Sequence, residues 1–453
     1  MRKVTITLGC ICALAALDAS HAARAAVSAD EAAKLKTTLT PVGAERAGNA
    51  DGTIPAWTGG MATNGARPDK IYTYTDPFAD EKPLFRITSA NVSQYADKLS
   101  EGTKALIAKF PDTFFVDVYP THRTFANPQF VYDNTFKNAT KASLDSTGNF
   151  PVGAWGGIPF PIPKNGAEVM WNHILRYSIP NGRVHAKGYS VTAIGQHVLN
   201  TDTYVNYDLP YYNEPAPTGD GNDVYLRYRF DQLGPPIRAG EGVLLWYALN
   251  PDHDEAWIYL TGQRRVRKLP NACCDVPHPV TAGVMGYDEV YVWTGRLDRY
   301  EWELVGKKEM YIPANSNRSV VGVSDDEYMG TKHYNPDKVR FELRRVWIVK
   351  AKLRPDKRHT APNATFYIDE DSWVAVQSER YDVKGELWKL GINPPVIFPE
   401  IPTTFPQCFG FNDIITGTSW YGSMTANVSD KINFVDYPPG YFTQDDLAGS
   451  GIR

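Results

Sequence analysis

The sequence predicts a mainly β protein of the α+β class, built as a large, curved, half-open antiparallel β-barrel with a few helices capping its concave side. Residues 339–353 alternate between apolar and polar side chains, which is the period of a strand that buries one face. Short strand-like runs follow up to residue 390, separated by Asp, Gly and Pro, as in an antiparallel meander. The chain also contains 26 Tyr and 11 Trp, residue types that favour strands.

Residues 1–25 have the organisation of a secretory signal peptide. Arg2 and Lys3 precede an apolar run, and small residues then offer cleavage sites after Ala22 or after Ala25. The apolar run is too short to span a bilayer. We therefore expect the mature chain to be exported.

Beyond this segment we expect a single large β domain, residues 26–453, with a helical and strap-like region over about 26–180. The length of 453 residues alone would allow about two or three domains, but all-β folds often extend as one unit. The net charge of −4, without a strong basic block, argues against nucleic acid as a partner. No later apolar run reaches membrane-spanning length.

Helices are expected mainly in the first part of the chain, where capping residues or apolar side chains recur at helical spacing. Gly- and Pro-rich runs at 39–60 and 150–163 are interpreted as ordered straps, and 125–165 as a whole is expected to be loop-like. The expected helices are residues 28–37, 91–110 and 166–177, and a strand is expected at 114–119.

From about residue 184 onward the pattern is mostly strands joined by short turns, which predicts sequential hairpins in one curved sheet. In the run at 223–231, Tyr228 and Phe230 face one way, and Arg227 and Arg229 face the other. The expected strands are residues 188–193, 203–211, 223–231, 242–249, 255–261, 264–268, 289–293, 302–304, 308–312, 339–353, 364–369, 372–378 and 381–388.

No motif assigns a catalytic residue, a metal site or a cofactor. The chain has no G-x-S-x-G, H-E-x-x-H, C-x-x-C, P-loop or G-x-G-x-x-G pattern. Acidic clusters at 252–255, 324–327 and 369–371 could supply carboxylates for acid–base chemistry or for a hard cation, although carboxylates in turns are usually solvated. A hydrolase acting on a glycan or an ester therefore stays as an alternative.

The apolar side of the predicted sheet is the candidate ligand site, because a lipid-like ligand needs an apolar, concave and largely preformed cavity. The same side chains could instead fill a solid core, as they do in small barrels. The candidate lining residues are Val224, Leu226, Tyr228, Trp246, Trp257, Tyr259, Phe341, Leu343, Trp347, Phe366 and Trp373.

The basic run at 264–268 has two interpretations. Alternation places Arg265 and Arg267 together, either at a solvated strand edge that discourages aggregation or at a cavity rim that binds an anionic head group. Arg345, which interrupts the apolar face of residues 339–353, is a third candidate for the same head group.

Cysteine usage leaves a disulfide open. Outside the signal segment the chain has Cys273, Cys274 and Cys408. In an oxidising compartment Cys408 would pair with Cys273 or with Cys274; the alternative is a set of buried thiols.

Four stretches together resemble the bacterial domain-of-unknown-function family 1329. They are LTPVGAERAGN at 39–49, IPAWTGG at 54–60, DEAWIYLTGQRRVRKLP at 254–270, and a later pattern formed by Ile368-Asp369, Trp373, Tyr381-Asp382, Gly385 and Leu387-Trp388. The adjacent thiols Cys273 and Cys274 depart from the family pattern.

The resemblance implies a fold similar to that of outer-membrane lipoprotein-sorting proteins and periplasmic lipid carriers of the LolA/LolB type. It further implies a periplasmic location, in association with the outer membrane, and a hydrophobic ligand. An outer-membrane barrel protein and a transporter of the resistance-nodulation-division type are the implied partners. No catalytic residue follows from it. The resulting hypothesis is a non-enzymatic carrier; the alternatives are the hydrolase and a purely structural partner of an outer-membrane barrel.

Overall fold

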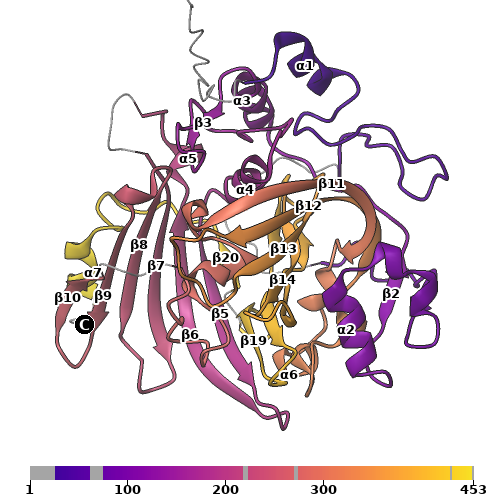
Figure 1. The fold of residues 1–453 in the computed structure, drawn as a ribbon. Coiled ribbons are helices and arrows are strands. Elements are labelled where there is room, and N and C mark those ends of the chain that lie inside the picture. Colours follow the sequence, from indigo (N-terminus) through magenta and orange to yellow (C-terminus); the bar gives the residue numbers. More distant parts are fainter. Residues whose placement is uncertain (1–25, 62–74, 218–222, 270–273, 429–430, 451–453) are drawn as a thin grey trace, which may run out of the picture.

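The computed structural model describes residues 26–61, 75–217, 223–269, 274–428 and 431–450. The predicted signal peptide lies outside these residues. Figure 1 shows a wide sheet that curves through the molecule, with helices near its ends and on its faces. In the described residues no helix combines the length and the apolar character needed to cross a membrane.

The elements have the following bounds. The helices are α1 (Ala29–Ala33), α2 (Glu101–Lys109), α3 (Gln129–Ala139), α4 (Gly166–Ile174), α5 (Pro210–Asn213), α6 (Asp325–Met329) and α7 (Gln444–Ser450), and the 3-10 turn η5 covers Tyr287–Val292. The strands are β1 (Phe85–Ile87), β2 (Val116–Tyr119), β3 (Ser143–Leu144), β4 (Pro151–Val152), β5 (Asn181–Val191), β6 (His197–Asp208), β7 (Val224–Gly234), β8 (Gly242–Ala248), β9 (Glu255–Leu260), β10 (Arg265–Lys268), β11 (Tyr300–Pro313), β12 (Phe341–Leu353), β13 (Asn363–Asp369), β14 (Ala375–Tyr381), β15 (Leu387–Ile392), β16 (Pro395–Ile397), β17 (Thr404–Pro406), β18 (Gly410–Asp413), β19 (Ser419–Met424) and β20 (Ile432–Asn433).

One sheet of 16 strands dominates the described part of the chain. Neighbouring strands run in the order β1-β2-β12-β13-β14-β15-β18-β19-β5-β6-β7-β8-β9-β10, with β11 beside β12 and β20 beside β5. The pairing is antiparallel apart from the short parallel contact of β2 with β12. β1 and β10 stand at opposite ends of this order, so the sheet is open. The predicted fold class, a curved and half-open antiparallel sheet with few helices, is confirmed.

Several local expectations were wrong. The expected strand at 381–388 is mostly the turn between β14 and β15. Residues 289–293 do not form a strand: 289–292 belong to η5 and Trp293 is its C-cap. Tyr291 and Val292 have positive φ angles of 48° and 76°, in the left-handed region. Residues 302–312 form one strand, β11, with a bulge at Gly306 (φ 133°), rather than two. The region taken as loop contains α3, which starts after Pro128 and buries Val131.

The expected helix at 91–110 is α-helical only over α2. Ser100 is its N-cap, because the Ser100 hydroxyl accepts a hydrogen bond from the Thr103 amide. Helix α2 packs on β14 and β15, and α4 packs on β11 and β12. At the other end of the sheet α7 packs across β8, β9 and β10 (Figure 1).

A buried network of charged side chains joins the N-terminal strap to the β13–β14 turn. The Arg123 guanidinium donates to both oxygens of Asp371, at 2.9 and 2.6 Å, and to the Glu45 carbonyl at 2.7 Å. Arg344 donates to Asp371 at 2.9 Å. Arg123, Arg344 and Asp371 are all less than one-tenth exposed. The N-terminal strap is therefore held against the buried part of the fold, as expected for an ordered strap.

Asp371→Asn should lower the free energy of unfolding by about 3–5 kcal/mol, because two buried guanidinium groups would lose their shared countercharge. Urea denaturation at neutral pH measures the change. The matched control is Asp356→Asn, whose carboxylate is 74% exposed; it should change stability by less than about 0.5 kcal/mol. Equal effects of the two substitutions would contradict the role given to the network.

Acidification should destabilise the protein through His173, a fully buried residue of α4. Its Nδ1 accepts from the Ala375 amide at 3.0 Å, and its Nε2 donates to the Trp293 carbonyl at 3.1 Å. Burial, reinforced by the Arg176 charge, lowers the pKa of His173 well below its ordinary value of 6.5. Because the unfolded chain takes up a proton near pH 6.5 and the folded chain does not, stability is complete above that pH and falls as the pH drops below it.

We expect His173→Gln to lose less stability than the wild type between pH 7 and pH 5, as measured by denaturation at both pH values. An unchanged pH dependence would argue against this origin. If the variant does not fold, an NMR titration of the wild-type imidazole decides: protonation of His173 above pH 6 would contradict the argument.

Candidate functional site

An apolar cavity of about 120 Å³ lies between the concave face of β5–β9 and the segment 278–294, named here the cover segment. The strands contribute Ala186, Lys187, Thr201, Thr203, Val205, Tyr228, Phe230, Gln232, Val243, Leu245, Tyr247 and Ile258, and the β7–β8 turn contributes Arg238. The cover segment contributes His278, Pro279, Val280, Thr281, Met285, Tyr287, Val290, Tyr291 and Thr294. Phe409, Trp420, Gly422 and Ser423 complete the lining.

Strand alternation decides which side chains reach the cavity. On β7, Tyr228 and Phe230 face it, as predicted, whereas Arg227 and Arg229 form ion pairs outside the cavity, for example between Arg227 and Asp208 at 2.8 Å. Tyr228, Phe230, Val243, Tyr247 and Ile258 are only partly buried although the cover segment lies over them. Part of their apolar surface therefore faces empty space rather than packed neighbours.

Buried charges fasten the cover segment to the sheet. The Glu289 carboxylate pairs with Arg380 at 3.3 Å and with Lys389 at 3.2 Å. Burial opposes ionisation, but these two cations hold the pKa of Glu289 below its usual value. Arg380 also donates to the Val292 carbonyl at 2.8 Å, and the Tyr291 hydroxyl lies 2.9 Å from that of Ser423. The cover is thus held by side chains from β14, β15 and β19 rather than by a strand ladder.

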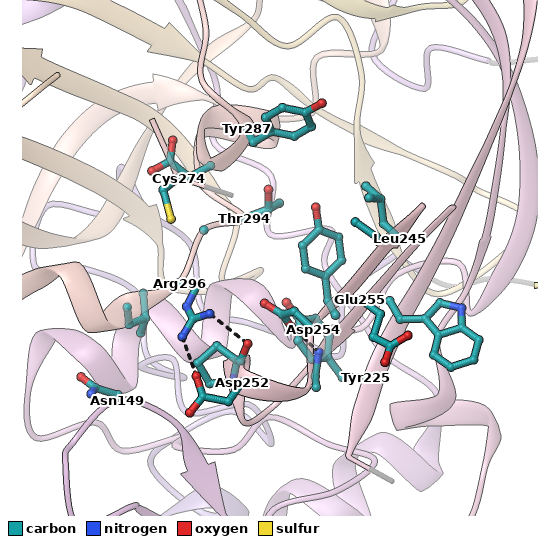
Figure 2. Close-up of a pocket in the computed structure, with 18 of the residues that line it drawn as sticks. Asn149, Tyr225, Leu245, Asp252, Asp254, Glu255, Cys274, Tyr287, Thr294 and Arg296 are labelled. Carbon is teal, nitrogen blue, oxygen red and sulfur yellow. Dashed lines mark hydrogen bonds and ion pairs between the residues drawn. The ribbon is translucent and has the colours of Figure 1, made fainter. Parts of the chain in front are cut away.

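A polar cleft of about 230 Å³ adjoins the cavity (Figure 2). Asp252, Asp254 and Glu255 lie in it near the β8–β9 turn, and Arg296 pairs with Asp252 at 3.0 Å. Both spaces are lined by Leu245, Tyr247, Tyr287 and Thr294, so these four residues form the boundary between them. The acidic turn singled out in the sequence therefore borders the apolar cavity.

Of the eleven predicted lining residues, the structure places Tyr228 in the cavity. Trp246 borders the polar cleft and donates to the Phe442 carbonyl at 3.0 Å, while Trp257 and Tyr259 pack under α7 with Leu447. The other predicted lining residues belong to the packed core. Phe341 and Leu343 lie in one hydrophobic cluster, and Phe366 and Trp373 lie in a second one, against which Trp347 packs. Leu226 packs against both clusters, and Val224 is buried at the start of β7.

The three predicted head-group residues are not brought together. Arg265 and Arg267 are exposed on β10, the edge strand, which fits the interpretation as a solvated edge. Arg345 is 9% exposed and pairs with Glu370 at 3.4 Å and with Glu45 at 3.5 Å. Its role in the structure is to bind the N-terminal strap, since it also donates to the Ala47 carbonyl at 3.0 Å.

Of the two possibilities left open for Cys408, the structure has the buried thiol, whose Sγ lies 3.5 Å from the Ser319 carbonyl. Burial raises the pKa of this thiol. Cys273 lies outside the described residues. Within those residues no group of three or more His, Cys, Asp or Glu side chains is arranged to hold a metal ion.

Sequence reasoning missed most of the cavity. Phe230 and Ile258 could have been found, because they share the period-2 pattern of the strands that were identified. The cover segment carried no such signal: its contribution depends on the left-handed turn at Tyr291 and Val292, which bring a distant loop onto the sheet.

Comparison with known proteins shows the following. The family model described as "Protein of unknown function (DUF1329)" matches residues 86–448. An uncharacterized protein of Pseudomonas aeruginosa is 42% identical over 372 residues, which are 81% of this chain and 81% of that protein.

Solved structures that resemble the chain are more distant. A domain described as an outer membrane lipoprotein-sorting protein domain from Vibrio parahaemolyticus is 12% identical, with a TM-score of 0.42, over 62% of this chain and 98% of that one. A DUF1329 family protein from Desulfovibrio piger is 14% identical, with a TM-score of 0.40, and the match covers 60% of this chain and 92% of that one. A LolA superfamily protein from Nitrosomonas europaea is 11% identical, with a TM-score of 0.36, and the match covers 63% of this chain and 100% of that one.

Proposed function

Because this chain belongs to the DUF1329 family, as its motifs predict, and because the family's description assigns no activity, we propose a function from the cavity itself. The protein is a non-enzymatic carrier that binds one hydrophobic, lipid-like ligand between the concave face of β5–β9 and the cover segment.

The observation that supports this proposal is the incompletely buried apolar surface beneath the cover. Tyr228, Phe230, Val243 and Ile258 face the cavity and are only partly buried. Interiors of proteins are normally packed without such gaps, and an apolar ligand that fills the gap gains about 25 cal/mol for each Å² it removes from water.

The ligand is elongated in this proposal. Ligand pockets usually measure about 300–1,000 Å³, more than the 120 Å³ of the cavity alone. The adjoining cleft adds about 230 Å³ beyond Leu245 and Thr294. A chain-like ligand can extend past these residues, whereas a broad one cannot.

The cellular setting belongs to the same proposal and is supported by the sequence motifs alone. Residues 1–25 direct export to the periplasm, and the carrier delivers its ligand toward the outer membrane, with an outer-membrane barrel and a resistance-nodulation-division type transporter as partners.

Filling the cavity should abolish ligand uptake. Val243→Trp places an indole in the cavity and should reduce uptake of palmitic acid and of hexadecanol by at least about tenfold. Native mass spectrometry of the purified protein after incubation with each compound measures uptake. The matched control, Val383→Trp, changes a residue that is 84% exposed and should bind as the wild type does. Wild-type protein that takes up neither compound, or a Val243→Trp variant that binds normally, would refute the carrier proposal.

Cell fractionation tests the location. The full chain should be recovered from the periplasm or with the outer membrane, and a chain that starts at residue 26 should stay in the cytoplasm. Recovery of both chains from the same compartment would contradict export by residues 1–25.

A further inference from the structure

The charges around the two adjoining spaces are separated by sign. The residues that line the apolar cavity include two cations, Lys187 and Arg238, and no Asp or Glu. The adjoining cleft is lined by Asp252, Asp254, Glu255 and Asp288, with Arg296 as its cation. A charged ligand therefore meets a different field in each space.

Strand register places Arg238 in the turn before β8 and the cleft residue Ala248 at the other end of that strand. Tyr287, which lines both spaces, packs against the His278 ring, with the ring centroids 4.6 Å apart. Gln232 pairs with Thr203 across β6 and β7, and the β7–β8 turn that follows Gly234 holds Arg238. β8 then runs from Gly242 back to Ala248, which borders the cleft. The turn residues on either side of Arg238 are exposed, and this end of the cavity is named the mouth.

The Arg238 guanidinium has donor capacity that the protein leaves unused. Its Nη2 pairs with Glu241 at 3.1 Å, but its Nε is buried and has no hydrogen-bond partner in the described part of the chain. A buried N–H without an acceptor is unfavourable. Because Arg238 lines the cavity, a rotation of its side chain toward a ligand oxygen would relieve the penalty. Guanidinium groups bind carboxylates and phosphates through two parallel hydrogen bonds.

His278 of the cover segment stands in the field of Arg238. Desolvation, reinforced by the Arg238 charge, lowers the pKa of His278 to about 4, so the imidazole is neutral at pH 7. The Val280 amide lies 3.5 Å from Nδ1, which makes Nδ1 the acceptor and leaves the proton on Nε2. The mouth of the cavity thus offers N–H donors from Arg238 and His278, and the Glu241 carboxylate beside Arg238 is an anion at the same end.

We propose that the ligand is an acidic amphiphile: one apolar chain that ends in a carboxylate or a phosphate, with the anionic end bound by Arg238 at the mouth and the chain directed toward Leu245 and Thr294. This inference rests on the proposed carrier function. The acidic cleft beyond the boundary residues disfavours the reverse orientation, because Asp252, Asp254 and Glu255 would repel the anion.

The test compares palmitic acid, hexadecyl phosphate and hexadecanol as ligands of the full mature chain, with isothermal titration calorimetry or native mass spectrometry as the readout. We expect one or both anions to bind at least about tenfold more tightly than the alcohol at neutral pH. The stronger of the two anions identifies a carboxylate or a phosphate as the preferred end. Equal affinity for all three compounds would overturn the inference while leaving the carrier function intact. No binding of any compound would overturn both.

Arg238→Leu should remove the preference. It should weaken binding of the anion by about tenfold and leave hexadecanol binding unchanged, whereas Arg238→Lys should retain part of the preference through its charge. The matched control is Arg267→Leu, an exposed arginine on β10 that should bind all three compounds as the wild type does. Retention of hexadecanol binding shows that Arg238→Leu is folded. A variant that keeps the full preference for the anion would refute the assignment to Arg238.

A second readout distinguishes contact from a general effect on the fold. In the anion complex the pKa of His278 should rise from about 4, because a negative charge then offsets the Arg238 field. NMR titration of the imidazole in the complexes with palmitic acid and hexadecanol measures the difference. An identical pKa in both complexes would place the anion away from this mouth.

Discussion

An open, curved sheet cannot bury its own concave face, and this constraint shapes the rest of the molecule. Closed barrels fill their interior with their own side chains, but here β1 and β10 stay apart at the ends of the strand order. Other elements must therefore cover the apolar surface. Helix α4 covers β11 and β12, and the cover segment lies over β5–β9. Helix α2 packs on the opposite face of β14, because Glu379 accepts from the Gly102 amide of α2 while its neighbour Arg380 donates to the Val292 carbonyl of the cover segment. The cavity is the part of the concave face where this covering is incomplete.

The covering elements are fixed by buried charges as well as by apolar contacts. Arg123, Arg344 and Asp371 fasten the N-terminal strap, and Glu289 with Arg380 and Lys389 fastens the cover segment. Loops without a strand ladder need side-chain partners for orientation, and a buried ion pair is directional where apolar packing is not. The second network holds the segment that lines the cavity. A cover held in place before a ligand binds favours a preformed site, because less ordering is then needed on binding.

The sheet could be predicted from the sequence, whereas most of the site could not. Alternation over β7 correctly assigned Tyr228 and Phe230 to one face and Arg227 to the other. The same pattern could not show which element covers each face of β9. Trp257 and Tyr259 pack under α7, whereas Ile258, on the other face, lines the cavity. Period-2 patterns mark that a face is buried but carry no information about the partner that buries it.

The roles of charged residues were harder still to predict, because their partners are distant in the sequence. Arg345 interrupts an apolar face, which suggested a ligand, but its partners Glu45 and Glu370 lie far away in the sequence and reach it only through the fold. Arg238 lies in an ordinary turn sequence and gave no signal. Its relevance comes from the cavity beside it and from an unused donor, both of which are properties of the tertiary structure.

The central claim is that the cavity under the cover segment holds an apolar chain, and a crystal structure of the mature protein with palmitic acid brominated at its terminal carbon tests it most directly. Anomalous scattering locates the bromine without reference to the rest of the ligand. The account predicts a bromine peak past Leu245 and Thr294, on the side of the cleft, with the carboxylate at Arg238. A peak under α7, on the opposite face of β8 and β9, or no ordered bromine in crystals that contain the ligand, would contradict it.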